Sequence, residues 1–418
     1  MKPVSALLHP VAARKLARCA VGLVDPRDDD ARDLGALPRT LCCKKLLPIA
    51  LGVWMIAQGD PLDAQRATEA GKQTRGFSFV SEVSSGEIGR VYVFSADSRA
   101  ACLDGKSGQA IWSVKVPGLE GEGVPGAGPV IAGSTLVYMG GGGFGTAYGL
   151  DLTTGESKWS LNRRSPAIAA GPRQVFLSMQ GGLGLLAVDA DTGTVQWERE
   201  ARSVGGVHRR ITYFEGKLFG DSSEVWDANT GQILTKLPIE PVDVAASAGR
   251  VFAVESALRA FDVGSAKTLW TAGAPSPRSA AVSFAASDHQ MAAVFYETQK
   301  NGATNAGVLR VYDTVNGSVL WDKQLQGFGL AGKKVSVDDD LVYLFEPSAV
   351  RNGTDRVTAF GITHGQERWT YTGRGLQGPA APAGDTVLVY SGEGSPPSYT
   401  LLYAIDRKTG SIKWKFDF

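Results

Sequence analysis

The sequence predicts an all-β fold, an eight-bladed β-propeller of four-stranded antiparallel blades. Three observations lead to this prediction. A pattern of Asp at position n, Gly at n+4 and Trp at n+8 recurs along the chain. Successive copies lie about 35 to 50 residues apart, which is the length of one four-stranded blade. Each copy joins two alternating apolar runs, the periodicity of half-buried strands, and no segment has the pattern of a long helix.

The repeat can be followed along the chain in five full copies and three degenerate ones. The full copies are Asp104, Gly108 and Trp112; Asp151, Gly155 and Trp159; Asp189, Gly193 and Trp197; Asp313, Gly317 and Trp321; and Asp406, Gly410 and Trp414. The degenerate copies are Asp227 and Gly231, with Thr235 in the Trp place; Asp262 and Trp270, with Ala266 in the Gly place; and Gly365 and Trp369, with Gly361 in the Asp place. The total predicts eight blades.

Each position of the repeat has a physical role. The Asp carboxylate can accept amides of a tight turn, and the Gly can take the positive φ that closes it. A second hairpin precedes each copy, as in "GPVIAGSTLVYMG" (128–140), so one unit contains strands A, B, C and D. The Trp lies on the outermost strand, D, where its indole can cover the gap to the next blade and donate its N–H to a carbonyl. Because an active-site residue would not recur in nearly every blade, we interpret these residues as packing residues.

The pattern Ala-x-Asp-x-x-Thr-Gly-x-x-x-Trp resembles the tryptophan-docking repeat of the PQQ-type, quinoprotein-like eight-bladed propellers. The resemblance covers about residues 76–418. The family includes quinoprotein alcohol dehydrogenases and, without any quinone, the outer-membrane β-barrel assembly lipoprotein BamB. The resemblance therefore implies either a PQQ enzyme or a protein-binding scaffold.

The residues that a quinoprotein dehydrogenase would need are missing from the repeats. Such enzymes commonly carry a disulfide between adjacent cysteines against the quinone and a Ca²⁺ ion held by Glu, Asn and Asp. The adjacent pair here, Cys42 and Cys43, lies before the repeats, and Cys102 reads as a small core residue. The acidic stretch 337–343, "VDDDLVY", lacks the spacing of a calcium loop and is interpreted as the turn between strands A and B of its blade. We therefore predict no catalytic, cofactor-binding or metal-binding residues. The alternative is a PQQ- and calcium-dependent dehydrogenase, or a sensor that binds a small ligand in the central funnel.

The first 65 residues do not join the repeat. Lys44 and Lys45 precede the apolar run 46–57, and small residues follow it, which is the order of a signal peptide. The run is too short to span a bilayer, which takes about 20 residues. We expect a leader over 1–65 that ends in this signal, a linker over 66–75 and the propeller over 76–418; the mature protein would then be periplasmic or secreted. A true translation start near Leu41 would explain the position of the signal, and a genuine N-terminal extension is the alternative.

The net charge and the lengths of the hairpins indicate which kind of partner the protein binds and on which face. A net charge of +1 gives no basic excess for nucleic acid or anionic lipid. The hairpins between strands B and C are long in four blades: 140–147, 297–307, 346–356 and 391–399. When the insertions of several repeats lie on the same face, that face often binds a partner. We predict a protein partner in the cell envelope on that face, bound by a monomeric propeller, while the alternative is that these are only mobile loop tips. The predicted contacts are Arg351, Asp355, Arg356 and Tyr399.

Overall fold

The computed structural model describes part of the chain. The described residues are 78–84, 87–95, 98–119, 129–140, 145–165, 167–179, 184–200, 211–241, 243–255, 257–276, 279–297, 306–326, 332–348, 353–391 and 401–418. The chain divides into two units, residues 1–72 and 73–418, and every described residue belongs to the second. The predicted leader (1–65) and linker (66–75) therefore lie outside the described residues.

The described residues form eight sheets of four strands each, and each sheet uses four consecutive strands paired antiparallel. Blade 1 contains β1 (Ser78–Ser84), β2 (Glu87–Ser95), β3 (Arg99–Asp104) and β4 (Ala110–Lys115); blade 2 contains β5 (Val130–Ala132), β6 (Thr135–Met139), β7 (Thr146–Asp151) and β8 (Ser157–Asn162). Blade 3 contains β9 (Ile168–Ala170), β10 (Gln174–Met179), β11 (Gly184–Asp189) and β12 (Val195–Arg199); blade 4 contains β13 (Ile211–Phe214), β14 (Lys217–Gly220), β15 (Glu224–Asp227) and β16 (Ile233–Lys236).

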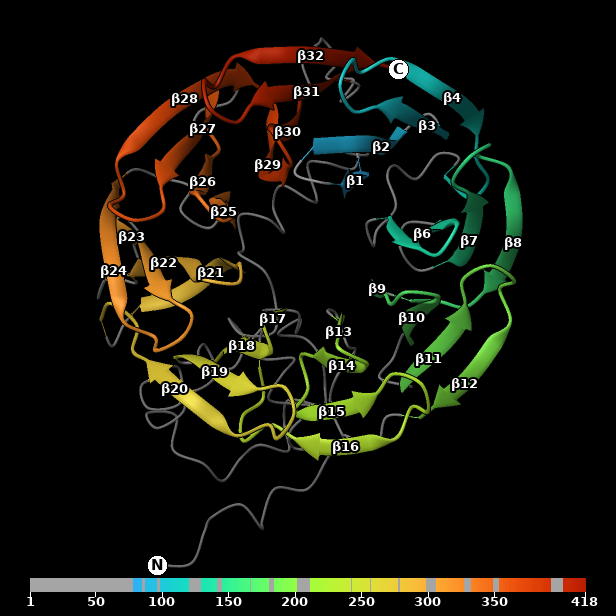
Figure 1. Ribbon diagram of the computed structural model, residues 1–418, viewed down its shortest axis with the longest axis horizontal. Helices are drawn as coiled ribbons and strands as arrows, with labels where there is room; N and C mark the ends of the chain where they lie inside the picture. Colours follow the sequence, from blue (N-terminus) through green and yellow to red (C-terminus); the bar gives the residue numbers. More distant parts are fainter. Residues whose placement is uncertain are drawn as a thin grey trace, which may run out of the picture. The chain divides into compact units, whose positions relative to one another are not determined.

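The second half of the ring repeats the same order. Blade 5 contains β17 (Asp243–Ser247), β18 (Arg250–Val254), β19 (Leu258–Asp262) and β20 (Thr268–Ala272); blade 6 contains β21 (Ser279–Ala286), β22 (Gln290–Glu297), β23 (Ala306–Asp313) and β24 (Val319–Gln326). Blade 7 contains β25 (Lys334–Val337), β26 (Leu341–Glu346), β27 (Thr354–Gly361) and β28 (Glu367–Arg374); blade 8 contains β29 (Leu376–Ala383), β30 (Thr386–Ser391), β31 (Leu401–Asp406) and β32 (Ile412–Asp417). Figure 1 shows the blades around a ring, with the first strand of each toward the centre and the fourth outside. The predicted eight-bladed all-β propeller is confirmed.

The core lies between neighbouring blades and is built from their middle strands. All five residues of β6 are buried, whereas the outer strand β8 alternates between exposed and buried positions. One cluster joins Val137 of blade 2 to Val175 and Leu177 of blade 3. Burial of such apolar surface is the main stabilising term of the fold. Because each cluster spans two blades, no blade completes its own core.

The indoles dock between blades as the repeat predicts. In seven blades the Nε1 atom donates a hydrogen bond of 2.6 to 3.1 Å to a carbonyl in the next blade's turn. The donor and acceptor pairs are Trp112 and Leu152, Trp159 and Ala190, Trp197 and Ala228, Trp270 and Thr314, Trp321 and Ile362, Trp369 and Arg407, and Trp414 and Gly105. Each indole thus satisfies its polar atom while it covers the boundary between two blades.

The ring closes without strand exchange among the described strands. Blades 1 and 8 each use only consecutive strands, and their core cluster joins Val91 to Leu388 and Leu402. Trp414, in the last strand, donates to the carbonyl of Gly105 at 2.8 Å. Figure 1 shows the C-terminus beside the junction of β32 and blade 1. Packing and one docked indole therefore hold the seam.

Candidate functional sites: the hairpin of blade 7 and a pocket between blades 7 and 8

The four predicted contact residues lie in the hairpins of blades 7 and 8. Arg351 and Tyr399 lie outside the described residues. Asp355 and Arg356 are the second and third residues of β27, the third strand of blade 7, which follows β26 in the chain. The structure thus brings two of the four residues together at the base of one long hairpin.

Asp355 has an internal role, which differs from the predicted one. Its side chain is buried, with 8% exposure. One carboxylate oxygen accepts the amide of Ser348 at 2.7 Å, and the other accepts the amide of Leu376 at 2.8 Å. Since Leu376 opens β29, this carboxylate ties the hairpin of blade 7 to blade 8. A buried carboxylate with both oxygens occupied is suited to holding the hairpin in place rather than to direct contact with a partner.

Arg356 is the exposed member of the pair, with a side chain 53% accessible. Its Nε and a terminal nitrogen donate to Oε2 of Glu346 at 2.8 and 2.5 Å, and the buried Lys333 pairs with the other oxygen of Glu346. Burial alone would raise the pKa of Glu346, but the hydrogen bonds and charges of Lys333 and Arg356 outweigh it and hold that pKa below its usual value. The guanidinium is therefore held in a defined position at the surface.

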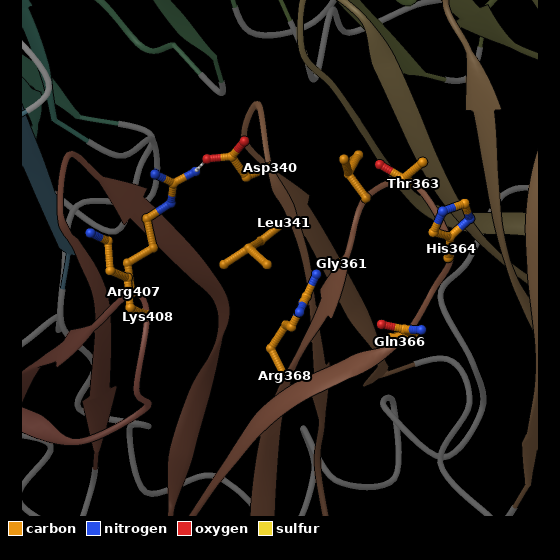
Figure 2. Close-up of a pocket in the computed structure, with 10 residues that line it drawn as sticks. Asp340, Leu341, Gly361, Thr363, His364, Gln366, Arg368, Arg407 and Lys408 are labelled. Atoms are coloured by element: carbon orange, nitrogen blue, oxygen red, sulfur yellow. Dashed lines mark hydrogen bonds and ion pairs between the residues drawn. The ribbon is translucent and has the colours of Figure 1, made fainter.

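A pocket of ≈ 460 Å³ lies between blades 7 and 8, among the turns that join strands A to B and C to D. Figure 2 shows Arg368 rising toward Gly361, while Arg407 of blade 8 is directed toward Asp340 and Lys408 lies beside Arg407. Asp340, Leu341, Ile362, Thr363, His364 and Gln366 complete the lining. Three of the lining side chains are permanent cations, whereas Asp340 is the single carboxylate among the lining residues. The pocket therefore has a positive balance.

Arg407 links blade 8 to the first turn of blade 7. Its Nε and a terminal nitrogen each donate to Asp338 at 2.9 Å, and the same terminal nitrogen donates to Asp340 at 2.7 Å. The hydroxyl of Tyr343 also donates to Asp338, at 2.6 Å. Burial would raise the pKa of Asp338, but these donors reverse the effect and lower it; burial together with Asp338 raises the pKa of Tyr343. The acidic stretch 337–343 thus forms the predicted A-to-B turn, since β25 ends at Val337 and β26 begins at Leu341.

The C-to-D turn of blade 7 has the same backbone hydrogen bond as the C-to-D turns of the other blades, but it has Gly361 where they have an Asp. In blade 2, Oδ1 of Asp151 accepts the amides of Thr153 and Thr154 at 2.8 and 3.0 Å. In blade 7 the amide of Gly365 still donates to the carbonyl of Gly361 at 2.9 Å. A Cβ added to Gly361 would lie 3.0 Å from Nε of Arg368, so this guanidinium lies beside the place that the missing side chain would take.

The sequence carries one signal for this pocket, which is not among the predicted site residues. Gly361 is visible there as a departure from the repeat, and Arg368 directly precedes Trp369. Nothing in the sequence indicates that Arg407 and Lys408 of the next blade line the same pocket. Among the described residues, no group of three or more His, Cys, Asp or Glu side chains could hold a metal ion.

The fold and its seven docked indoles define the class: an eight-bladed propeller with tryptophan-docking repeats. The chain belongs to the family described as outer membrane protein assembly factor BamB, which matches residues 60–216 and 220–416. Comparison with the curated proteins gives no match.

Three solved structures have a similar fold. BamB from Moraxella catarrhalis is 14% identical, with a TM-score of 0.53, and the match covers 82% of this chain and 96% of that one. The dihydro-heme d1 dehydrogenase NirN is also 14% identical, with a TM-score of 0.55 and coverage of 82% and 73%. The computationally designed protein Ika8 is 17% identical, with a TM-score of 0.53 and coverage of 71% and 87%. Because these identities are low and the three proteins differ in kind, this likeness concerns the fold alone.

Proposed function

We propose that this protein is an exported, non-catalytic scaffold that binds other proteins of the cell envelope, in the setting of outer-membrane protein assembly. The observation that carries the proposal is the family match over residues 60–216 and 220–416. The order of charged, apolar and small residues before the propeller supports export to the periplasm or beyond. Among the described residues, no helix is both long and apolar enough to cross a bilayer.

The use of the tryptophans also supports a non-catalytic role. All seven docking indoles donate Nε1 to backbone carbonyls of neighbouring blades. Trp226 is 3% exposed and packs in the cluster of Trp197. A quinone needs an aromatic face to stack on, and every propeller tryptophan is committed to packing. We assign no residue to PQQ or calcium.

The surface we assign to a partner is the side of the long B-to-C hairpins, with Arg356 at its described edge. An exposed arginine that is held in a defined position is a common contact residue in protein interfaces. Trimming residues 299–305, in the hairpin of blade 6, should weaken partner capture while the melting temperature stays the same, because this change leaves the strands intact.

Photo-crosslinking in cells tests the proposal directly. A photoreactive residue replacing Arg356 should give adducts with envelope proteins, which mass spectrometry can identify. The matched control carries the same residue in place of Lys415, which is exposed on the outer strand β32. Adducts from both positions alike, or from Lys415 alone, would contradict the assignment of the hairpin face.

The alternative, a PQQ-dependent dehydrogenase or a sensor using the central funnel, shares its fold with the dehydrogenase NirN. Purified protein can be mixed with PQQ and Ca²⁺ while quinone absorbance and dye-linked oxidation of simple alcohols and sugars are followed. Stoichiometric binding with turnover would replace the scaffold proposal. We expect neither.

A further inference from the structure

We propose that the pocket between blades 7 and 8 binds a carboxylate group, which takes the place that an Asp side chain fills in the turns of the other blades. The site lies among the C-to-D turns, away from the B-to-C hairpins, so it does not rest on the proposed function.

The repeat itself shows what the turn binds. In six of the seven turns that have the Asp, Oδ1 accepts two successive backbone amides, and in blade 5 Oδ1 of Asp262 accepts the amide of Ser265. Asp189 accepts the amides of Asp191 and Thr192 at 3.1 and 2.9 Å, and Asp406 accepts those of Lys408 and Thr409 at 3.0 and 2.8 Å. Such a pair of converging N–H groups is a small anion site. Seven copies of the turn therefore hold a carboxylate of their own chain.

Blade 7 keeps the amide pair and lacks the carboxylate. The amide of Gly361 donates to the carbonyl of Gln366 at 2.7 Å and closes the turn as in the other blades. Thr363 and His364 occupy the two amide positions and are exposed. Within the described part of the chain, neither amide has an acceptor. The turn therefore offers two oriented donors to an acceptor from outside the chain.

The side chains around this turn add charge of the right sign. The guanidinium of Arg368 lies beside Gly361, where the carboxylate would be. Lys408 faces the same pocket from blade 8, and neither cation has an acidic partner among the described residues. Arg407 is already occupied by Asp338 and Asp340. The guanidinium of an arginine and two backbone amides can together donate to both oxygens of one carboxylate. Charge-assisted hydrogen bonds of this kind are stronger than hydrogen bonds between neutral groups.

The pocket also has apolar walls that favour a carboxylate on a short side chain. Leu341 and Ile362 line it beside the turn. An Asp or Glu side chain of a peptide, or a small free dicarboxylate, could place methylene groups against these walls and its charge against the amides. The shared chemistry is the carboxylate, and the experiment separates the two sources.

The test measures binding of a fluorescent pentapeptide, Gly-Leu-Asp-Leu-Gly, to the purified protein by anisotropy. We expect the Asn analogue of the peptide to bind about tenfold more weakly, because it loses the charge-assisted contacts. Arg368→Gln should weaken binding by a similar factor. Gly361→Asp should abolish it, since the new side chain would occupy the amide pair. Lys415→Gln, which removes one cation from outside the pocket, should leave the affinity unchanged.

Competition identifies the source of the carboxylate. If succinate displaces the peptide at about the peptide's own Kd, the ligand is a free carboxylate; if only peptides compete, it is an acidic segment of a protein. Equal binding by wild type and Gly361→Asp, or stronger competition by inorganic phosphate than by succinate, would overturn the proposal. No binding of either probe would overturn it as well.

A second measurement needs no variant. In amide NMR spectra of the wild type, succinate should shift the Thr363 and His364 resonances and leave those of Thr153 and Thr154, whose amides are occupied by Asp151, in place. Shifts spread equally over both turns would refute a site at blade 7.

Discussion

In seven of the eight turns, the glycine four residues after the Asp position of the repeat meets two conditions at once. Its φ is positive, at 73° in Gly193, a region that residues with a Cβ rarely adopt. A Cβ there would also lie 2.7 Å from the indole of Trp159 in the preceding blade. The repeat in the sequence predicts only the first condition, the positive φ. The second depends on a residue one blade away.

Comparing Gly193→Ala with Gly249→Ala separates the cost of the positive φ from the cost of contact with the indole. Gly249 has nearly the same φ, 71°, and open space around its missing Cβ. We expect Gly249→Ala to cost about 1 kcal/mol from backbone strain. Gly193→Ala should cost about 1 to 3 kcal/mol more, because the methyl group displaces the indole. Urea unfolding of both variants measures the difference, and equal losses would refute the packing requirement.

The pairing of Asp338 with Arg407 predicts an acid-sensitive link between blades 7 and 8. The pKa of Asp338 in the folded protein lies below its ordinary value of 3.8. A lowered pKa contributes stability that is present above the ordinary pKa and is lost as the pH falls through the lowered one. The melting temperatures of the wild type and Asp338→Asn should therefore differ most above about pH 5 and converge as the pH falls below 3.8. A difference that stays constant over this range would show that the charge does not contribute.

At the scale of the strands, Trp and Gly act as a pair across a blade boundary. The outer strand of blade 4 has Thr235 in the Trp place, and the following turn, in blade 5, has Ala266 in the Gly place. Ala266 keeps the positive φ, 55°, and the turn bond from its amide to the carbonyl of Asp262 at 2.8 Å. A methyl group is tolerated there because no indole comes from blade 4. The two departures from the repeat therefore belong to one boundary.

A double-mutant cycle at this boundary tests the pairing. Thr235→Trp alone should be neutral or destabilising, because the new indole meets the methyl group of Ala266. Combined with Ala266→Gly, the same indole should stabilise the protein by about 1 kcal/mol or more relative to Ala266→Gly alone. Chemical unfolding of the four proteins gives the coupling energy. A coupling near zero would mean that the indole and the glycine do not depend on each other.

For the whole molecule, the boundary between blades 8 and 1 is the one at which the described strands of neighbouring blades are not consecutive in the sequence. Trp414 supplies its docked indole, and its ring lies 2.6 Å from a Cβ added to Gly108. Because each blade relies on its neighbours for its core, an open seam exposes apolar surface on two blades.

Deletion of residues 411–418 should open this seam, since it removes β32 and its indole. We expect a broader unfolding transition in calorimetry and faster amide exchange, first in blades 1 and 8. Trp197→Ala, which removes a docked indole from a boundary that the chain does cross, is the control and should lower the melting temperature with less loss of cooperativity. Uniform exchange across all blades after the deletion would contradict a weak seam.

The sequence by itself determined the number of blades, the order of strands within them and the docking of the indoles. These features depend on local alternation of apolar residues, on turn chemistry and on a period that the chain displays directly. Only the tertiary structure decided that Asp355 is buried and bonded to Leu376 of blade 8, and that Arg368 of blade 7 and Lys408 of blade 8 line one pocket beside the turn at Gly361. The physical reason is that the contacts between blades 7 and 8 join residues about 20 to 50 positions apart, and the packing of the blades alone sets which side chains meet across their boundary.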